Sequence, residues 1–215
     1  MLEKLTNGKN SGAYFTFDTA IEKEITYQIA ISFVSIENAK ENLKSEKKFA
    51  DFNFCKKETQ KIWNQNLSKI KIKSKSEDKL TQFYTHLYHS MIHPNIVSDI
   101  NGEYMGADFM KKRVEKGRDH YSSFSVWDTY RTQGQLVAML FPKESSDMME
   151  SLVNFAKEAG GYGRWILANI ETGIMQGDQT PILISNSYAF GGDNFNVEGA
   201  YEFMKKGALQ LRLRS

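Results

Sequence analysis

The sequence predicts a mainly α-helical protein with a short N-terminal β portion. Residues 12–36 alternate in side-chain character and are rich in β-branched and aromatic residues, which is typical of strands. Beyond residue 75, apolar residues recur at helical spacing. Only three prolines occur in 215 residues, which also favours helices. Paired helices joined by long loops, as this second part predicts, are typical of an α/α barrel or toroid.

The N-terminal part predicts two strands, within 13–18 and 25–34. Two strands do not make a stable sheet by themselves. The hairpin is therefore expected either to pack on the helices or to pair with strands outside this chain. From Ser35, a candidate N-cap, the pattern becomes helical, and a second helix is expected over 49–70.

The remaining elements are predicted to be helices joined by glycine-rich loops. Ser76 is expected to cap a helix over 76–93, because acidic residues follow in its first turn, and Pro94 ends it. In the loop that follows, Asn101 and Gly102 predict a tight turn. The later helices are expected at 127–141, 144–160, 181–190 and 197–211.

Helices of this number cannot close an α/α barrel. Because an incomplete barrel leaves apolar helix faces uncovered, we expect the isolated chain to aggregate.

Composition excludes several classes of protein. The net charge is +2, from 28 basic and 26 acidic residues, so no strong field indicates nucleic acid or an anionic membrane as a partner. No apolar run is long enough to span a bilayer. The single Cys55 excludes an internal disulfide. The N-terminus lacks the apolar core of a signal peptide, so either the protein is cytosolic or the chain begins after the true N-terminus.

The segment 121–131 carries the pattern that most favours a sugar site. Trp127 offers a flat apolar face for a sugar ring, and Asp128 and Arg131 are charged groups that each hold two hydroxyls. On one helix, the spacings of three and four would place all three side chains on the same face. The alternative is an amphipathic core helix with an ion pair between Asp128 and Arg131.

A second candidate for the sugar site is Glu171. It lies among small and apolar residues within 165–178, with no cationic partner nearby in the sequence. A polar group in such surroundings is costly unless it is paired or functional. The alternative is a helix N-terminus capped by Thr172 or Asn169.

Two patterns suggest metal binding, but each has a simpler explanation. His86, His89 and His93 could share one helical face as ligands, yet no carboxylate completes the set, so core packing or capping is favoured. Residues 99–108 are similar to a calcium loop in composition. They lack the acidic spacing and the terminal glutamate of an EF-hand, so a turn is favoured there.

Taken in order, these segments resemble glycoside hydrolase family 92, the calcium-dependent exo-α-mannosidases. The resemblance implies that 1–36 is the end of a β-sandwich domain, that 37–75 is a helical linker, and that 76–215 is the first part of an (α/α)6 barrel. It also implies substrate-binding roles for Trp127 and Asp128, and for Arg131 and Glu171. The matching pieces are 83–94, 98–106, 124–131, 165–177 and 188–191. Residues 12–18 and 31–39 are similar to the end of the family's β-sandwich domain.

The resemblance further implies an inverting hydrolysis of terminal α-linked mannose from mannose-containing glycans. In such a reaction, one carboxylic acid protonates the leaving oxygen and a second carboxylate activates water. The family's acid and base motifs are expected beyond residue 215, so we predict no catalytic residue in this chain and no activity for it alone. Calcium is the implied cofactor, with ligands unknown. The full-length protein is expected to be secreted, periplasmic or on the cell surface of a bacterium.

Two alternatives stay open. Another inverting (α/α)6 glycosidase, of trehalase or glucoamylase type, would also place Trp-Asp and Arg near the sugar, although loop 99–106 argues against it. A non-catalytic carbohydrate-binding protein is the other alternative. Ile166 and Gln179 stand where many members of family 92 carry glutamate and histidine, so the linkage preference is open.

Overall fold

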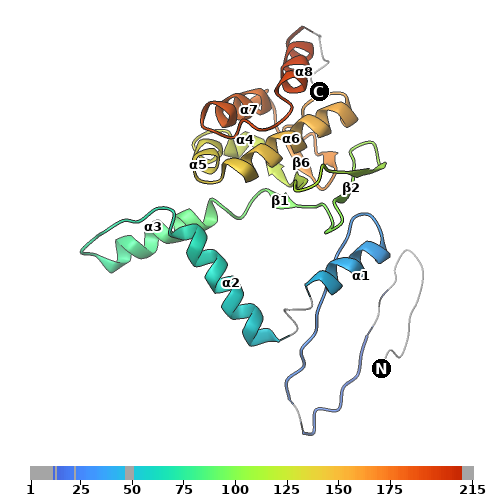
Figure 1. Ribbon diagram of the computed structural model, residues 1–215, viewed down its shortest axis with the longest axis vertical. Helices are drawn as coiled ribbons and strands as arrows, with labels where there is room; N and C mark the ends of the chain where they lie inside the picture. The colour runs from blue at the N-terminus through green and yellow to red at the C-terminus, as the bar shows by residue number, and fades with distance from the viewer. Residues whose placement is uncertain (1–11, 13, 22, 47–50, 210–215) are drawn as a thin grey trace.

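The computed structural model describes residues 12, 14–21, 23–46 and 51–209, and these are mostly helical with three small sheets (Figure 1). The helices are α1 (Ile36–Ser45), α2 (Phe52–Leu67), α3 (Glu77–His89), α4 (Val126–Thr129), α5 (Gln133–Leu140), α6 (Pro142–Ala159), α7 (Gln179–Ala189) and α8 (Val197–Leu209). The strands are β1 (Asn95–Ile96), β2 (Glu103–Met105), β3 (Lys111–Arg113), β4 (Tyr121–Ser122), β5 (Phe124–Ser125), β6 (Trp165–Leu167) and β7 (Ile170–Glu171).

The hydrophobic core is built around α6. Met149, Leu152 and Val153 recur at helical spacing, and the last two have no exposed surface. Helices α5, α7 and α8 and strand β4 pack against α6. Pro142 in the first turn and Gly160 in the left-handed conformation delimit this helix, as these residue types do at helix ends. The rest of the core comes from Tyr121, Phe124, Val126, Phe155, Ile166, Leu183, Ile184 and Ala200.

The predicted helix starts are confirmed at two caps. Ser35 accepts a hydrogen bond from the backbone N–H of Asn38 at 3.0 Å, and Ser76 accepts one from Lys79 at 3.4 Å. Helix α2 begins after Asp51, whose carboxylate caps it. Its expected start at residue 49 lies outside the described residues, as do the expected end of the last helix at 211 and residues 1–11.

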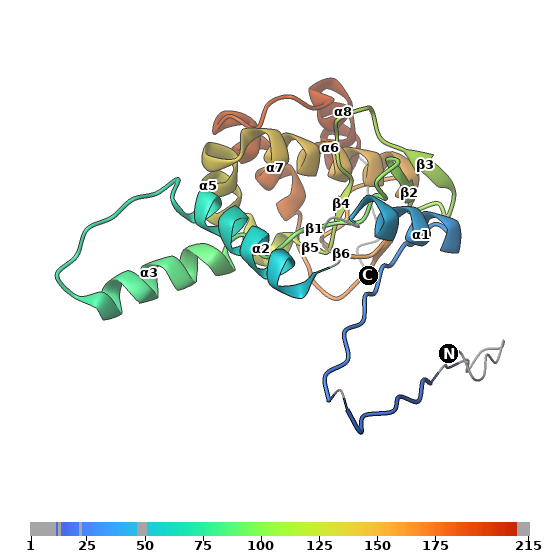
Figure 2. The same cartoon turned by 60° about the horizontal axis from the view of Figure 1, so that its bottom comes forward.

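The strands predicted between 12 and 36 are not formed by the described residues of that segment. The backbone there is extended and leads away from the helical body (Figure 2), without the ladder of a strand pair. Its apolar side chains are uncovered: Ile21 is 94% exposed and Tyr27 is 78% exposed. Alternation in sequence becomes a strand only when a neighbouring backbone and a buried face stabilise it. The β-sandwich portion therefore stays a prediction.

Helix α3 ends four residues earlier than expected. It was predicted to reach residue 93, but its last residue is His89. Gln133 of α5 donates hydrogen bonds from Nε2 to the carbonyl oxygens of Ser90 (2.8 Å) and His93 (3.2 Å). A contact with a residue distant in sequence thus holds the chain where it leaves the helix for β1.

The helix predicted over 127–141 is wrong as a single element, because it divides into α4 and α5. Thr132 lies between them with a φ of 60°, a left-handed conformation that β-branched residues rarely adopt. The break lies between two tertiary anchors. Val126 is fully buried in the core, and Gly134 packs so closely on α7 that a Cβ there would collide with Leu183. Arg131 consequently belongs to neither helix.

The loop expected over 95–121 contains four short strands. β1 pairs with β4, and β2 pairs with β3 as a hairpin. The predicted turn at Asn101 and Gly102 is confirmed: Gly102 has a φ of 81°, and its N–H donates to the carbonyl of Asp99 at 2.7 Å. These strands have only two or three residues each, so turn signals rather than alternation mark them in the sequence.

Apolar side chains remain uncovered on α7 and α8. Ile182, Tyr188 and Tyr201 are each about half exposed or more, which agrees with the expectation of open helix faces. Large apolar patches promote association. Aggregation of the isolated chain stays a prediction.

Close packing at Gly192 predicts a sharp sensitivity to substitution. A Cβ at this position would lie 2.5 Å from Ser145 Oγ and 2.6 Å from Ser187 Oγ. These two hydroxyls are buried and hydrogen-bonded to each other, with 2.5 Å between their oxygens. Gly192→Ala in the full-length protein should lower the free energy of unfolding by about 1–3 kcal/mol, measured by urea denaturation. Gly207→Ala is the control, because a Cβ there meets nothing within 4 Å. Equal stability of the two variants would contradict the packing argument.

Candidate functional site

A three-stranded antiparallel sheet brings two of the sequence-predicted segments together. β5 pairs with β6 so that Ser125 faces Trp165, and β6 pairs with β7 so that Ile166 faces Glu171. The chain passes directly from β5 into α4, which carries Trp127 and Asp128. The tryptophan and aspartate of the predicted sugar motif therefore leave the sheet beside the 165–171 hairpin, although some 40 residues separate the two segments in sequence.

Trp127 and Asp128 are presented at the surface by a buried neighbour. Val126 has no exposed surface and fixes the first turn of α4 in the core. Trp127 is 45% exposed, and Asp128 is exposed as well. One carboxylate oxygen of Asp128, Oδ2, accepts a hydrogen bond from the hydroxyl of Ser125. An exposed aromatic face beside an exposed carboxylate is the combination that a sugar ring and its hydroxyls require.

Arg131 is placed differently from the sequence prediction. The prediction that Arg131 shares one helical face with Trp127 and Asp128 is wrong, because α4 ends at Thr129. The alternative of an ion pair with Asp128 is also wrong. Arg131 instead donates from Nε to the Tyr130 hydroxyl at 2.7 Å, and its guanidinium carbon lies 5.2 Å from the centre of that ring. Its substrate role stays a prediction.

Glu171 is surrounded by backbone donors. Its Oε2 accepts from the N–H groups of Arg164 (2.5 Å) and Trp165 (3.2 Å), and its Oε1 accepts from Gly173 (3.0 Å). The carboxylate thus ties the turn before β6 to the end of β7. Glu171 is accordingly well placed to set the position of Trp165, while contact with substrate stays a prediction.

The alternative of a helix start near Glu171 is wrong, since 165–171 is a β-hairpin. Thr172 donates a hydrogen bond from its hydroxyl to the carbonyl of Trp165 at 2.9 Å, and Asn169 donates one from its amide to the carbonyl of Gly106 at 3.0 Å.

Two residues depart from the pattern of the resembled family. Ile166 is buried in the core. Gln179 begins α7 and donates a hydrogen bond to the carbonyl of Gln176.

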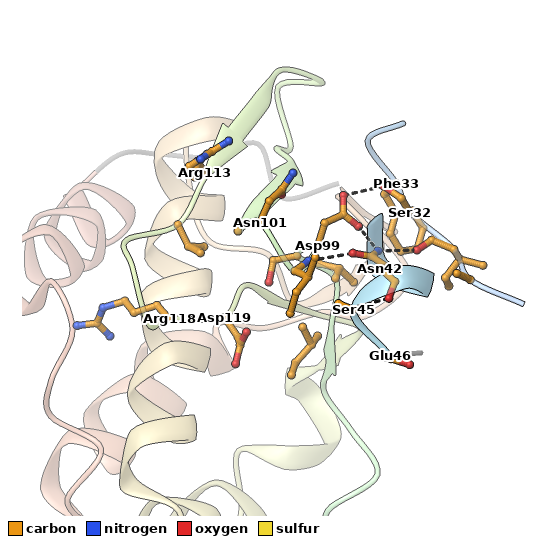
Figure 3. Close-up of a pocket in the computed structure, with 18 of the residues that line it drawn as sticks. Ser32, Phe33, Asn42, Ser45, Glu46, Asp99, Asn101, Arg113, Arg118 and Asp119 are labelled. Carbon is orange, nitrogen blue, oxygen red and sulfur yellow. Dashed lines mark hydrogen bonds between the residues drawn. The ribbon is translucent and has the colours of Figure 1, made fainter. Parts of the chain in front are cut away.

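A buried carboxylate that the sequence analysis assigned only to a turn, Asp99, joins α1 to the rest of the molecule. Three side chains donate to it: Ser32 (2.7 Å), Asn38 (2.8 Å) and Asn42 (2.7 Å), as Figure 3 shows in part. Asn38 and Asn42 lie one turn apart on α1, so both amides point the same way. The spacing of four residues between these asparagines is visible in the sequence and indicates a shared polar face. The sequence does not indicate that Asp99 is the partner of that face.

Glu103 extends this network on β2. It accepts hydrogen bonds from Asn38 at 3.0 Å and from Arg113 at 3.0 Å, and it forms an ion pair with Lys111 at 3.3 Å. The Asn38 hydrogen bond, followed by that of Arg113, lowers the pKa of Glu103 from 4.5 to about 2. The carboxylate is thus kept charged where α1 meets the β2–β3 hairpin.

A cavity of about 770 Å³ lies beside this junction (Figure 3). The N-terminal arm at 29–33, the end of α1, and the segments 96–102 and 113–119 line it. Burial raises the pKa of Asp119 in its wall. None of Trp127, Asp128, Arg131 or Glu171 lines this cavity, so it is separate from the predicted sugar motif.

Two further polar clusters were not found from the sequence. The carboxylate of Asp147 is almost fully buried and pairs with Arg118 at 2.9 Å and Lys143 at 2.7 Å. His120 stacks on Tyr104 with ring centres 3.7 Å apart, and burial lowers the pKa of this histidine to about 3. Both clusters join the loop before β4 to neighbouring elements, and neither forms part of the sugar motif.

Comparison with known proteins decides the family. The glycosyl hydrolase family 92 catalytic domain matches residues 38–214. The chain belongs to this family. No curated protein matched the chain.

Solved structures of family 92 share this fold. The family GH92 alpha-mannosidase BT3965 from Bacteroides thetaiotaomicron is 28% identical with a TM-score of 0.78, over 85% of this chain and 25% of that protein. Its complex with mannoimidazole gives 27% identity and a TM-score of 0.77, over 85% and 24% of the two chains. The inverting mannosidase BT2199 from the same organism, at 24% identity and a TM-score of 0.77 over 85% and 25%, shows the fold alone. The chain thus spans about a quarter of the length of these family 92 proteins.

The described ranges contain no group of three or more histidine, cysteine, aspartate or glutamate side chains able to hold a metal ion. No helix within these ranges has the length and apolar character needed to cross a membrane.

The low pKa of Glu103 predicts acid sensitivity. The unfolded chain takes up this proton near pH 4.5 and the folded chain only near pH 2, so falling pH favours unfolding within that window. Wild-type full-length protein should lose stability between pH 4.5 and 2 more steeply than Glu103→Gln. Melting temperature followed against pH tests this. Parallel curves for the two proteins would contradict it.

The buried ion pair of Asp147 predicts a stability loss. Asp147→Asn removes the buried charged partner of Arg118 and Lys143 and should cost about 1.5–3 kcal/mol, measured by urea denaturation. Glu115→Gln removes the exposed partner of the same arginine, an interaction worth about 0–1 kcal/mol, and serves as the matched control. A larger effect for the control would overturn this ranking.

Proposed function

We propose that the full-length protein containing this chain is a calcium-dependent, inverting exo-α-mannosidase that removes terminal α-linked mannose from glycans. Membership of family 92 supports a glycoside hydrolase. Similarity to an alpha-mannosidase whose structure holds mannoimidazole supports mannose as the sugar. We further propose that the protein acts outside the bacterial cytoplasm.

The observation that carries this proposal is the exposed Trp127–Asp128 pair at the end of β5, within a chain of this family. The indole of Trp127 would stack on the apolar face of the mannose ring. The carboxylate of Asp128 would accept hydrogen bonds from its hydroxyls, and a charged acceptor makes these bonds stronger than neutral ones. This chain would thus supply one wall of the sugar site.

The other candidate residues have supporting roles in the proposal. Among the described residues, the two terminal nitrogens of Arg131 have no hydrogen-bond partner, so they are available to sugar hydroxyls. Glu171 holds Trp165 beside the motif by accepting a hydrogen bond from its N–H, and it also accepts from the N–H groups of Arg164 and Gly173. The general acid and the general base of an inverting hydrolysis are assigned to no residue of this chain. The chain by itself is accordingly proposed to release no mannose.

Substitution of Asp128 tests the proposal. Asp128→Asn in the full-length protein should lower kcat/KM for an aryl α-mannoside by about tenfold or more, since it replaces a charged acceptor with a neutral amide. Released mannose is measured, with and without a calcium chelator. Asp178→Asn is the control, because this exposed aspartate at the start of α7 has no side-chain cap bond.

Each other result has a defined meaning. Hydrolysis of an aryl α-glucoside, with no hydrolysis of the aryl α-mannoside, would replace the proposal with a glucosidase. Binding of mannose with no hydrolysis by the full-length protein would indicate a carbohydrate-binding protein. Unchanged activity in the chelator would remove calcium from the proposal, and unchanged activity of Asp128→Asn would remove this residue from the site.

A further inference from the structure

The hydroxyl of Ser125 is used differently from what its sequence position predicts. Ser125 and Asp128 have the spacing of a capping box, in which the N-cap serine accepts a hydrogen bond from the backbone N–H three residues on. Ser125 does precede α4, yet its side chain makes no cap bond. Its Oγ instead donates to Oδ2 of Asp128. The hydroxyl is thus directed to the carboxylate and not to the helix backbone.

The backbone of Ser125 is held by contacts independent of this bond. Ser125 pairs with Trp165 across the β5–β6 ladder. Its carbonyl oxygen accepts a hydrogen bond from the hydroxyl of Thr129 at 3.0 Å. The next residue, Val126, is anchored in the core. A fixed stretch of main chain therefore presents the hydroxyl to Asp128.

Asp128 differs from Ser125 in having little else to hold it. Its side chain is exposed, and among the described residues Oδ1 has no hydrogen-bond partner. A carboxylate has about four acceptor sites, so binding one oxygen restrains rotation of the group while leaving the other oxygen for a ligand. The bond from Ser125 thus selects one orientation of an exposed side chain.

We propose that Ser125 is a positioning residue that orients the Asp128 carboxylate so that Oδ1 faces the sugar hydroxyls. The inference rests on the proposed function, since it requires Asp128 to contact the sugar. A group that is already ordered binds without the entropic cost of fixing its rotamer. Loss of the serine hydroxyl should therefore weaken substrate binding more than it slows the chemical step.

The experiment measures kcat and KM for an aryl α-mannoside with the full-length protein. Ser125→Ala should lower kcat/KM by about tenfold to a hundredfold, mainly through a higher KM, because the lost bond is to a charged acceptor. Ser125→Thr keeps a hydroxyl and should recover most of the loss. Should Ser125→Ala fail to fold, Ser125→Cys has a similar size and a weaker donor and should show the same direction.

A double-mutant cycle separates positioning from a general effect on folding. Because Ser125 acts through Asp128, Ser125→Ala combined with Asp128→Asn should be no less active than Asp128→Asn alone. Ser146→Ala is the control, because it removes a buried serine hydroxyl on α6 that accepts a hydrogen bond from the backbone N–H of Asn194 and contacts neither Ser125 nor Asp128. It should lower the melting temperature and leave KM unchanged.

The possible failures are distinguishable. An active wild type with an unchanged KM in Ser125→Ala, or losses that multiply in the double variant, would overturn the role of Ser125 and leave the proposed function standing. A wild type that neither binds nor hydrolyses α-mannosides would overturn both.

Discussion

Burial of α6 is the constraint on which the rest of the helical body depends. Its apolar residues form the centre of the core, and its buried polar residues hold the surrounding loops. Ser151 accepts a hydrogen bond from the backbone of Tyr121 at 2.9 Å, and Ser146 accepts one from Asn194 at 3.1 Å. Because Tyr121 begins β4, this helix also determines where the following strand β5 and the Trp127–Asp128 motif emerge.

The carboxylates of this chain differ in how completely they are satisfied. Asp99 accepts bonds from three side chains, Asp147 pairs with two cations, and Glu171 binds three backbone amides. A buried charge needs hydrogen-bond or ion-pair partners, because leaving it unpaired costs roughly several kcal/mol of stability. Asp128 is exposed, and within the part of the chain that the structure describes its one donor is Ser125. This contrast separates carboxylates that hold the fold together from one that is open to a ligand.

Polar contacts, rather than a continuous core, connect α1 to the helical body. Asn38 and Asn42 reach Asp99 from one face of the helix, and the charge of Glu103 is stabilised by Arg113 on the neighbouring strand. The stability of this junction is tied to the ionisation of Glu103, whose pKa is lowered by the hydrogen bond from Asn38 and then by that from Arg113. This acid-sensitive group lies where α1 meets the β2–β3 hairpin.

Local signals in the sequence determined where α1 and α3 begin and where the 99–102 turn forms, because a cap or a turn depends on residues only a few positions apart. Ser35, Ser76 and Gly102 acted in this way. The sequence also identified the family segments and the Trp127–Asp128 motif. Only the tertiary structure decided that 127–141 breaks at Thr132, that Glu171 binds backbone amides, and that Asp99 gathers donors from α1. Those outcomes depend on which distant residues meet around α6 and at the α1 junction, and no local pattern encodes such partners.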